Sequence, residues 1–339
     1  MRVRVLGAGI IGLACADELV RRGHRVEVLD PQPGRGASYA AAGMLTPGSE
    51  VWHGEESLWR LGLRSRDLWP AYAARLDVPL NAHGTLLVAR DHGDLLEVDR
   101  QAGLLEASGA DVRRLTGREL VEHEPTLTDR LAGGVLLADD PSVDPRAVVS
   151  ALLSRHRGRL REQRGDLDEG GCDVTVVATG SRLPAPLTHL VRGVRGEVVR
   201  VLARDRPRGT VRGWVRGEPV YVVPREGGEL VIGATSEEHD DDPVVTVGGV
   251  ARLLEAAREL LPSLDRATFV EAAARDRPGT RDNLPLVGPS GLPGVVLAAG
   301  HFRHGVLLAP LTAQLVADHL ETGAVEPALD PRRFGGETA

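Results

Sequence analysis

The chain of 339 residues is longer than one ordinary domain, and its apolar fraction of 42% suffices for a sizeable hydrophobic core. Its net charge is −7 and its basic residues are spread along the chain, which argues against nucleic acid as a partner. No apolar run reaches the roughly 18 residues of a membrane span, and the first predicted strand starts at residue 2. The sequence therefore predicts no membrane segment, no signal peptide and a cytoplasmic location.

The basic residues are all arginines, because the sequence contains no lysine. This excludes a lysine Schiff base and a P-loop lysine. It leaves arginine as the only permanent cation for an anionic substrate, and the planar guanidinium suits a carboxylate. Cys15 and Cys172 lack the spacing of a metal or redox pair, and no metal site is predicted.

The N-terminal residues predict the start of a nucleotide-binding fold. The run over residues 3–6 is short and rich in β-branched side chains, as in a buried parallel strand, and Gly7, Gly9 and Gly12 follow where that strand turns into a helix. Such glycines permit a tight turn, let the backbone approach a pyrophosphate, and allow the helix to pack closely on the sheet. The free N–H groups of the first helical residues then face the phosphates.

A second apolar strand ends at Asp30, where a carboxylate accepts hydrogen bonds from the hydroxyls of an adenosine ribose. An acid at this position repels the extra phosphate of NADP, which leaves NAD or FAD. The next residues, 31–45, are rich in small side chains that leave space for a long ligand. A bound flavin needs a segment of this kind, which can lie against it without filling the space that it occupies.

The middle of the chain predicts alternating helices and strands. The expected elements are one or two helices over 55–74, a strand over 84–89, helices over 91–108 and 116–123, a strand over 134–138 and a helix over 144–155. Asp144 is the expected N-cap of the last helix, with Pro145 at its first position.

The later part predicts a second buried parallel strand over 172–180 and then antiparallel structure over 196–274. One helix over 249–261 interrupts the antiparallel region, and a strand over 294–300 precedes a helix over 306–320. The sequence therefore predicts an α/β protein in which a Rossmann-like domain is interleaved with an antiparallel-sheet domain.

Several short motifs carry a resemblance to a known family. Besides the opening glycines, they are Ala41-Ala42-Gly43-Met44-Leu45, Tyr221-Val222-Val223-Pro224-Arg225, Ile232-Gly233-Ala234-Thr235, Arg277-Pro278-Gly279-Thr280 and Gly300-His301-Phe302-Arg303-His304-Gly305. Together they resemble the D-amino-acid oxidase superfamily of flavoproteins, and within it the glycine oxidases of thiamine biosynthesis. The resemblance covers nearly the whole chain.

The resemblance implies noncovalently bound FAD, oxidation of a primary or secondary amine to an imine, and reduction of dioxygen to hydrogen peroxide. It implies a small amino-acid substrate, and any homo-oligomer rests on analogy. The charge and the lack of a long apolar run, as above, predict no nucleic acid and no membrane as partner. The corresponding division assigns residues 1–79, 144–190 and 275–339 to an FAD-binding domain. Residues 80–143 and 191–274 form the expected substrate-binding domain.

Three residues are expected to contact the substrate. In the family, the arginine at the position of Arg303 pairs with the substrate carboxylate, and the tyrosine at the position of Tyr221 lines the pocket. These two are the predicted catalytic and substrate-binding residues, and Arg277 is a third substrate-binding candidate. Each residue also has an alternative interpretation without a role in the site. Arg303 is then a surface arginine that caps a loop, Tyr221 a core residue of its strand, and Arg277 a structural arginine in a salt bridge. Alternation along its strand places Tyr221 on the face opposite Val220.

The expected cofactor-binding residues come from the glycine turn, the small-residue segment, the end of the second parallel strand and the last motif. They are Gly7, Gly9, Ile10, Ile11, Gly12, Asp30, Ser38, Ala41, Ala42, Gly43, Met44, Ala178, Thr179, Gly180, Gly300, His301, Arg303, His304 and Gly305. His301 and His304 have side chains that titrate near neutrality in water, and we assign them backbone roles first.

Two departures from the family pattern limit the prediction. The segment 155–174 is short and polar where relatives carry a fuller sheet near the adenine, so no cofactor contact is assigned there. No cysteine lies near Arg277 or Arg303, which disfavours the covalent flavin link of the sarcosine oxidases. The alternatives are a D-amino-acid dehydrogenase with another electron acceptor and a sarcosine-type N-methyl amine oxidase. More distant ones are a pyridine-nucleotide dehydrogenase and a noncatalytic nucleotide-binding protein.

Overall fold

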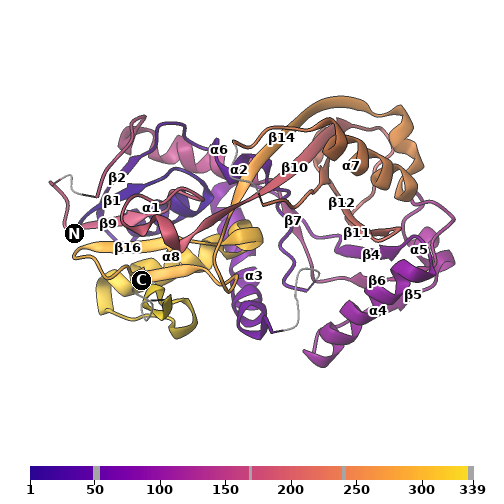
Figure 1. The fold of residues 1–339 in the computed structure, drawn as a ribbon, viewed down its shortest axis with the longest axis horizontal. Coiled ribbons are helices and arrows are strands. Elements are labelled where there is room, and N and C mark those ends of the chain that lie inside the picture. The colour runs from indigo at the N-terminus through magenta and orange to yellow at the C-terminus, as the bar shows by residue number, and fades with distance from the viewer. Residues whose placement is uncertain (49–53, 168–169, 239–241, 335–339) are drawn as a thin grey trace.

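A computed structural model describes residues 1–48, 54–167, 170–238 and 242–334. Two large sheets lie side by side, one toward each end of the molecule, and each is covered by helices (Figure 1). The long strands β10 (Arg192–Leu202) and β14 (Thr268–Gly279) run from one half of the molecule into the other. The mixed α/β class predicted from the sequence is confirmed.

The first sheet has six strands, and all are parallel except one edge strand, β15, which runs antiparallel to its neighbour. In spatial order the strands are β15 (Leu286–Pro289), β16 (Val295–Ala299), β9 (Val174–Val177), β1 (Arg2–Leu6), β2 (Arg25–Leu29) and β8 (Leu160–Arg161). The helices of this half are α1 (Ile10–Arg21), α2 (Ala37–Ala40), α3 (Glu56–Leu76), α6 (Pro145–His156) and α8 (Gly305–Thr322).

Both faces of this sheet are buried, because side chains alternate along each strand. Val3 and Val5 of β1 pack in the core shared with α1, α3, α6 and α8. Leu6 packs in a second core on the opposite face, with Leu29 and Leu297 from neighbouring strands. The predicted strands at residues 3–6 and 172–180 are therefore confirmed as buried parallel strands.

The second sheet has eight strands and is antiparallel except where β11 meets β4. In spatial order the strands are β14, β10, β13 (Glu229–Gly233), β12 (Glu218–Pro224), β11 (Thr210–Val215), β4 (Thr85–Ala89), β6 (Gly133–Leu137) and β5 (Arg113–Leu115). Its helices are α4 (His92–Ala107), α5 (Gly117–His123) and α7 (Val247–Leu260). A small sheet pairs β3 (Leu80–Asn81) with β7 (Ser142–Val143).

The predicted helices all form, and their caps follow local chemistry. The expected one or two helices over 55–74 are a single helix, α3. Asp144 caps α6 by accepting a hydrogen bond from the backbone N–H of Arg146 at 2.9 Å, and Pro145 occupies the first position as predicted. In α5, Thr116 and Glu119 form a reciprocal capping box.

The strands of the second sheet are harder to delimit from sequence. The sequence indicates antiparallel character over 196–274 but does not separate out β11 or β14. β14 is the edge strand and its burial does not alternate, so its pattern has no period of two. It also crosses the predicted domain boundary at residues 274 and 275, and the division into two domains remains a prediction.

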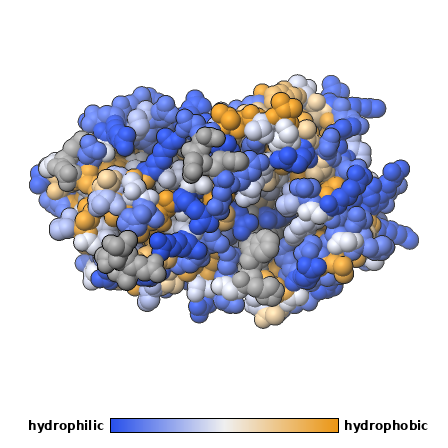
Figure 2. All heavy atoms as spheres, in the orientation of Figure 1, coloured by the Kyte–Doolittle hydropathy of each residue, from blue (hydrophilic) through white to orange (hydrophobic). Residues whose placement is uncertain are grey.

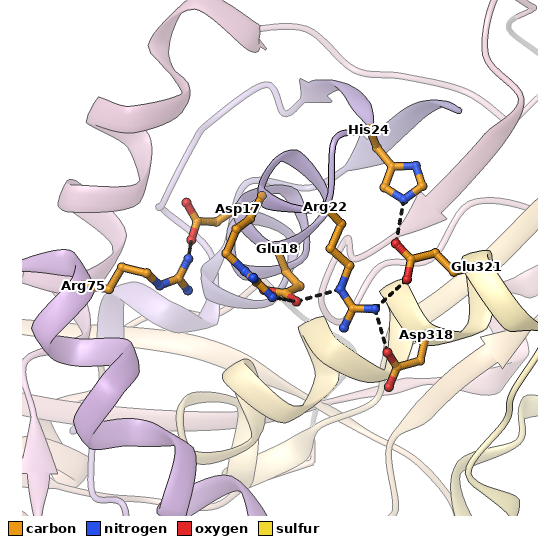
Figure 3. Close-up of polar contacts among 8 residues, drawn as sticks. Asp17, Glu18, Arg22, His24, Arg75, Asp318 and Glu321 are labelled. Atoms are coloured by element: carbon orange, nitrogen blue, oxygen red, sulfur yellow. Dashed lines mark hydrogen bonds and ion pairs between the residues drawn. The ribbon is translucent and has the colours of Figure 1, made fainter.

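Ion pairs fix the N-terminal helix α1 against α8 (Figure 3). The buried carboxylate of Glu18 accepts hydrogen bonds from Arg21 at 2.6 Å and from Arg22 at 2.8 Å. Arg22 also donates to Asp318 at 2.7 Å and to Glu321 at 2.8 Å on α8. The ion pairs therefore join the end of α1, the helix that follows the glycine-rich turn, to α8 near the C-terminus.

This network predicts a pH-dependent stability. Burial raises the pKa of Glu18, but the hydrogen bonds from Arg21 and Arg22 outweigh it and hold the pKa below its usual 4.5. A lowered carboxyl pKa stabilises the fold above the unfolded value near 4.5, and this contribution is lost as the pH falls through the folded pKa. Glu18→Gln should therefore destabilise the protein by about 1–2 kcal/mol at pH 7. Thermal unfolding of both proteins with excess FAD should show that the difference in stability between wild type and Glu18→Gln becomes smaller below about pH 4.5. A difference at pH 3.5 as large as that at pH 7 would contradict the prediction.

Among the described residues, no helix combines the length and apolar character that crossing a membrane requires. Hydrophilic side chains cover most of the molecular face in Figure 2.

Candidate active site

The glycine-rich turn between β1 and α1 leaves no room for side chains. Gly7 has a φ of +103°, and a Cβ there would lie 2.3 Å from the carbonyl oxygen of Ala178. A Cβ at Gly12 would lie 1.9 Å from the carbonyl oxygen of Gly7. The turn therefore packs directly against the end of β9, and α1 packs directly against the turn.

Two polar side chains hold this turn from outside. The carboxylate of Asp30, at the end of β2, accepts hydrogen bonds from the backbone N–H of Ala8 at 2.6 Å and of Gln32 at 2.7 Å. The hydroxyl of Ser38 accepts one from the N–H of Ile10 at 3.0 Å. Each carboxylate oxygen has a second lone pair, so Asp30 retains the capacity to accept ribose hydroxyls.

A cavity of about 720 Å³ runs from this turn to the face of the second sheet that carries Tyr221. Most of the predicted site residues line it. They are Gly7, Gly9, Ile10, Ile11, Asp30, Ser38, Ala41, Ala42, Gly43, Met44, Ala178, Thr179, Gly180, Tyr221, Arg277, His301, Arg303 and Gly305.

Three predicted cofactor-binding residues do not line the cavity. Gly12 lies behind the turn, where the Gly7 carbonyl fills the space beside it. Gly300 has a φ of +71° and shapes the bend after β16. His304 is buried and donates its backbone N–H to the carbonyl of His301 at 2.9 Å. These three residues lie next to lining residues without lining the cavity themselves, and their contact with the cofactor stays a prediction.

The substrate candidates Tyr221 and Arg277 each lie flat over a glycine. Tyr221 faces Gly233 across the β12 and β13 pair, and a Cβ on Gly233 would lie 2.3 Å from the tyrosine hydroxyl. A Cβ on Gly196 would lie 2.2 Å from a guanidinium nitrogen of Arg277. Val220 packs in the core on the opposite face of the sheet, as the predicted alternation requires.

Arg277 is not held by a salt bridge within the described residues. Its guanidinium donates to the carbonyls of Arg195 at 3.3 Å and Thr235 at 3.2 Å. Both bonds use one nitrogen, Nη1, and a guanidinium has five N–H donors. Arg277 can therefore donate further hydrogen bonds into the cavity.

The turn after β16 presents Arg303 from a strained backbone. Phe302 has a φ of +46°, which is uncommon for a bulky residue, and the Arg303 guanidinium lies 5.0 Å from the centre of the Phe302 ring. The buried imidazole of His301 shares a 2.8 Å hydrogen bond with the Thr312 hydroxyl on α8. The turn is thereby anchored to the helix that follows it.

Titration of His301 near neutrality does not occur in the folded protein. Burial, together with a smaller effect of the nearby His304, lowers the pKa of its imidazole to about 3. His301 is therefore neutral at physiological pH. A neutral imidazole beside Arg303 does not compete with it for an anionic substrate.

The sequence did not indicate several arginines and an aromatic residue that also line the cavity. Arg212 and Trp214 lie on β11, and Arg212 pairs in register with Tyr221. Because directly paired residues share a sheet face, alternation along β11 would have found both once that strand was recognised. Arg35 lies in the loop just before α2, and Arg275 lies on β14. No local sequence pattern identifies either of them as a residue that lines the cavity.

The polar segment 155–174 also reaches the cavity. β8 extends the first sheet beside β2, and the N–H of Asp30 donates to the carbonyl of Arg161 at 3.2 Å. Arg164 and Gly165 line the cavity near Asp30 and Leu29. The shortened segment thus forms the wall at the expected adenine end.

These features fit a flavin dinucleotide. A glycine turn without Cβ atoms faces a helix N-terminus, which suits a diphosphate. Of the described lining residues, seven are arginines and two are aspartates, so the cavity favours anionic ligands. Neither Cys15 nor Cys172 lines the cavity.

The glycine turn and the long cavity beside it define a dinucleotide-binding protein. Residues 2–319 match the DAO family of FAD dependent oxidoreductases, and the chain belongs to this family. It is therefore an FAD-dependent enzyme.

Individual relatives are similar over almost the full length. The chain is 35% identical to the glycine oxidase of Geobacillus kaustophilus (strain HTA426), over 94% of this chain and 92% of that protein. It is 34% identical to the putative thiamine biosynthesis oxidoreductase ThiO of Rhizobium etli, over 96% and 98% of the two chains. The crystal structure of the Geobacillus kaustophilus glycine oxidase superposes with a TM-score of 0.87 at 34% identity, and 98% of each chain is covered.

Proposed function

We propose that this enzyme oxidises glycine or a small related amine to the imine, and that dioxygen is reduced to hydrogen peroxide. The observation that carries the proposal is the convergence of Arg303, Tyr221 and Arg277 on one cavity with the dinucleotide turn. Two cations and a phenol suit a carboxylate, and the same cavity holds the cofactor. The similarity to glycine oxidases selects glycine among the amines.

In this proposal Arg303 and Tyr221 bind the carboxylate and orient the substrate's Cα–H, and positioning supplies much of the rate. Arg277, on β14, adds positive charge to the cavity, and its guanidinium keeps N–H donors that its bonds to Arg195 and Thr235 do not use. Bound FAD supplies the acceptor for the hydride. His301 stays neutral and holds the turn that carries Arg303.

We further assign the cofactor to residues 1–79, 144–190 and 275–339, and the substrate face to residues 80–143 and 191–274. The distribution of strands supports this division, because the strands of the first sheet lie in the former ranges. The FAD is held noncovalently in this proposal, since no cysteine of the chain lines the cavity. The two free thiols suit the cytoplasm. A contribution to thiamine synthesis follows from the similarity to ThiO.

The proposal is tested by recording the visible spectrum of the purified enzyme anaerobically while glycine is added. Air is then admitted and peroxide is measured. Bleaching by glycine, followed by recovery with peroxide, is the expected result. A flavin that glycine leaves oxidised would direct the search to D-amino acids and N-methyl amines. Bleaching without peroxide on aeration would indicate a dehydrogenase with another acceptor.

Tyr221→Phe tests the pocket directly. Removing the hydroxyl deletes one hydrogen bond to the carboxylate, so KM for glycine should rise about fivefold to tenfold while kcat changes less. The ring still covers Gly233, so the fold should be unaffected. Steady-state kinetics under air give both constants, and an unchanged KM would return Tyr221 to a packing role.

A further inference from the structure

We propose that Arg225 is a positioning residue, which holds the cofactor-lining segment 41–44 at a fixed distance from strand β12 and its Tyr221. Arg225 lies at the end of β12, in the hairpin turn before β13. It does not line the cavity. It acts through the backbone of Ala42, which does.

The contacts of Arg225 join two parts of the chain that are far apart in sequence. Its backbone N–H donates to the carbonyl of Glu229 at 2.8 Å and closes the hairpin. One end of its guanidinium donates to the carbonyl of Ala42, and the other donates to the carbonyl of Pro224 at 3.3 Å. The residue is 8% exposed, so these bonds are shielded from water.

The opposite side of the segment is already fixed by backbone. The carbonyl of Gly43 accepts the N–H of Val143 at 2.9 Å, and the N–H of Leu45 donates to Pro141 at 2.9 Å. Gly43 has a φ of +72°, and a Cβ there would lie 2.0 Å from the carbonyl oxygen of Val143. The segment is thus held from one side by residues 141–143 and from the other by Arg225.

A small layer of apolar side chains lies between segment 41–44 and the second, eight-stranded sheet. Ala42 and Val223 are buried in it, and Met44 and Tyr221 pack against it. Helix α2, just before the segment, lies beside β14 of the same sheet (Figure 1). A displacement of segment 41–44 would therefore change the spacing between the cofactor and the strand that carries Tyr221.

The charge of Arg225 is buried without a close counter-ion. No carboxylate of the described residues forms an ion pair with it within 4 Å. Burial lowers the pKa of its guanidinium to about 10, with Asp144 acting against this, so it stays charged at neutral pH. Burying a charge costs free energy that only its hydrogen bonds offset. Within the described residues the Nε of Arg225 has no partner, so the bond to Ala42 is one of only two side-chain hydrogen bonds that the guanidinium makes.

The first test measures FAD affinity and does not depend on the substrate. The holoenzymes of wild type, Arg225→Gln and Arg225→Lys are diluted serially, and released FAD is measured by its fluorescence. We expect Kd to rise about tenfold in Arg225→Gln, which corresponds to roughly 1.4 kcal/mol. Arg225→Lys keeps a charged donor, so its Kd should lie between the other two.

Arg90→Gln is the matched control. Arg90 directly follows β4 of the second sheet and is mostly buried, and it donates to the carbonyl of Arg130 at 2.8 Å. Unlike Arg225 it also pairs with a carboxylate, that of Glu259 at 2.9 Å, and it does not line the cavity. It should lower thermal stability and leave the Kd for FAD within about twofold of wild type. An Arg225→Gln enzyme with lowered stability and an unchanged Kd would overturn the proposal. If Arg225→Gln does not fold, an unchanged Kd in Arg225→Lys overturns it equally.

The second test uses the proposed function, on which it rests. Because Arg225 acts on the cofactor side, the anaerobic rate of flavin reduction by saturating glycine should fall about fivefold or more with little change in KM. A rise in KM with an unchanged rate would overturn the positioning role. If glycine fails to reduce the wild-type flavin, the proposed function fails, and the FAD affinities still decide the function of Arg225.

Discussion

Replacing Arg303 with alanine is expected to lower kcat/KM for glycine about 100-fold or more while FAD remains bound. The guanidinium is the cation that the turn after β16 presents to the cavity, and charge-assisted hydrogen bonds to a carboxylate contribute about 1.5–3 kcal/mol each. Most of the loss should appear in KM if the carboxylate is bound equally in the ground and transition states. Steady-state peroxide production and the bound-flavin spectrum together give the result.

Arg182→Ala is the control for Arg303→Ala. Arg182 also lines the cavity, but its side chain is 76% exposed and pairs at 2.7 Å with the exposed Asp242. An exposed ion pair of this kind contributes little, so glycine kinetics should stay within about threefold of wild type. If Arg303→Ala kept wild-type kinetics with FAD bound, the carboxylate would have to bind elsewhere, and Arg277 would be the next residue to replace.

The second large effect is expected from Gly12→Ala, which should leave the purified protein with about tenfold less FAD per chain. The new Cβ would lie 1.9 Å from the Gly7 carbonyl, which is backbone and cannot rotate away. Either α1 moves from the turn or the turn deforms, and overpacking of this kind costs about 1–3 kcal/mol. The ratio of flavin to protein absorbance after purification with added FAD measures the outcome.

Gly103→Ala is the matched control for this substitution. Gly103 lies within α4, and a Cβ there would meet nothing within 4 Å. Alanine in a helix interior is favoured over glycine by about 0.5–1 kcal/mol, so this variant should be slightly more stable and keep its FAD. Full FAD content in Gly12→Ala would show that the helix can move away from the turn without harm to the site.

The sequence by itself determined the local units of this protein. The first strand, the glycines Gly7 and Gly12, the first helix and Asp30 follow one another within thirty residues, so their geometry depends on near neighbours. The cap of α6 at Asp144 is equally local. Strong periodicity and turn chemistry over short distances were enough to predict these elements, together with the family motifs around Tyr221 and Arg303.

Only the tertiary structure decided which distant residues meet. Arg212 faces the cavity because β11 pairs with β12, and Arg277 lies over Gly196 because β14 pairs with β10. Arg225 reaches Ala42 across 183 positions of the chain. The edge strand β14 shows no alternation that would reveal it. Such pairings depend on sheet register between segments far apart in sequence, and a local pattern does not encode which partner a strand will find.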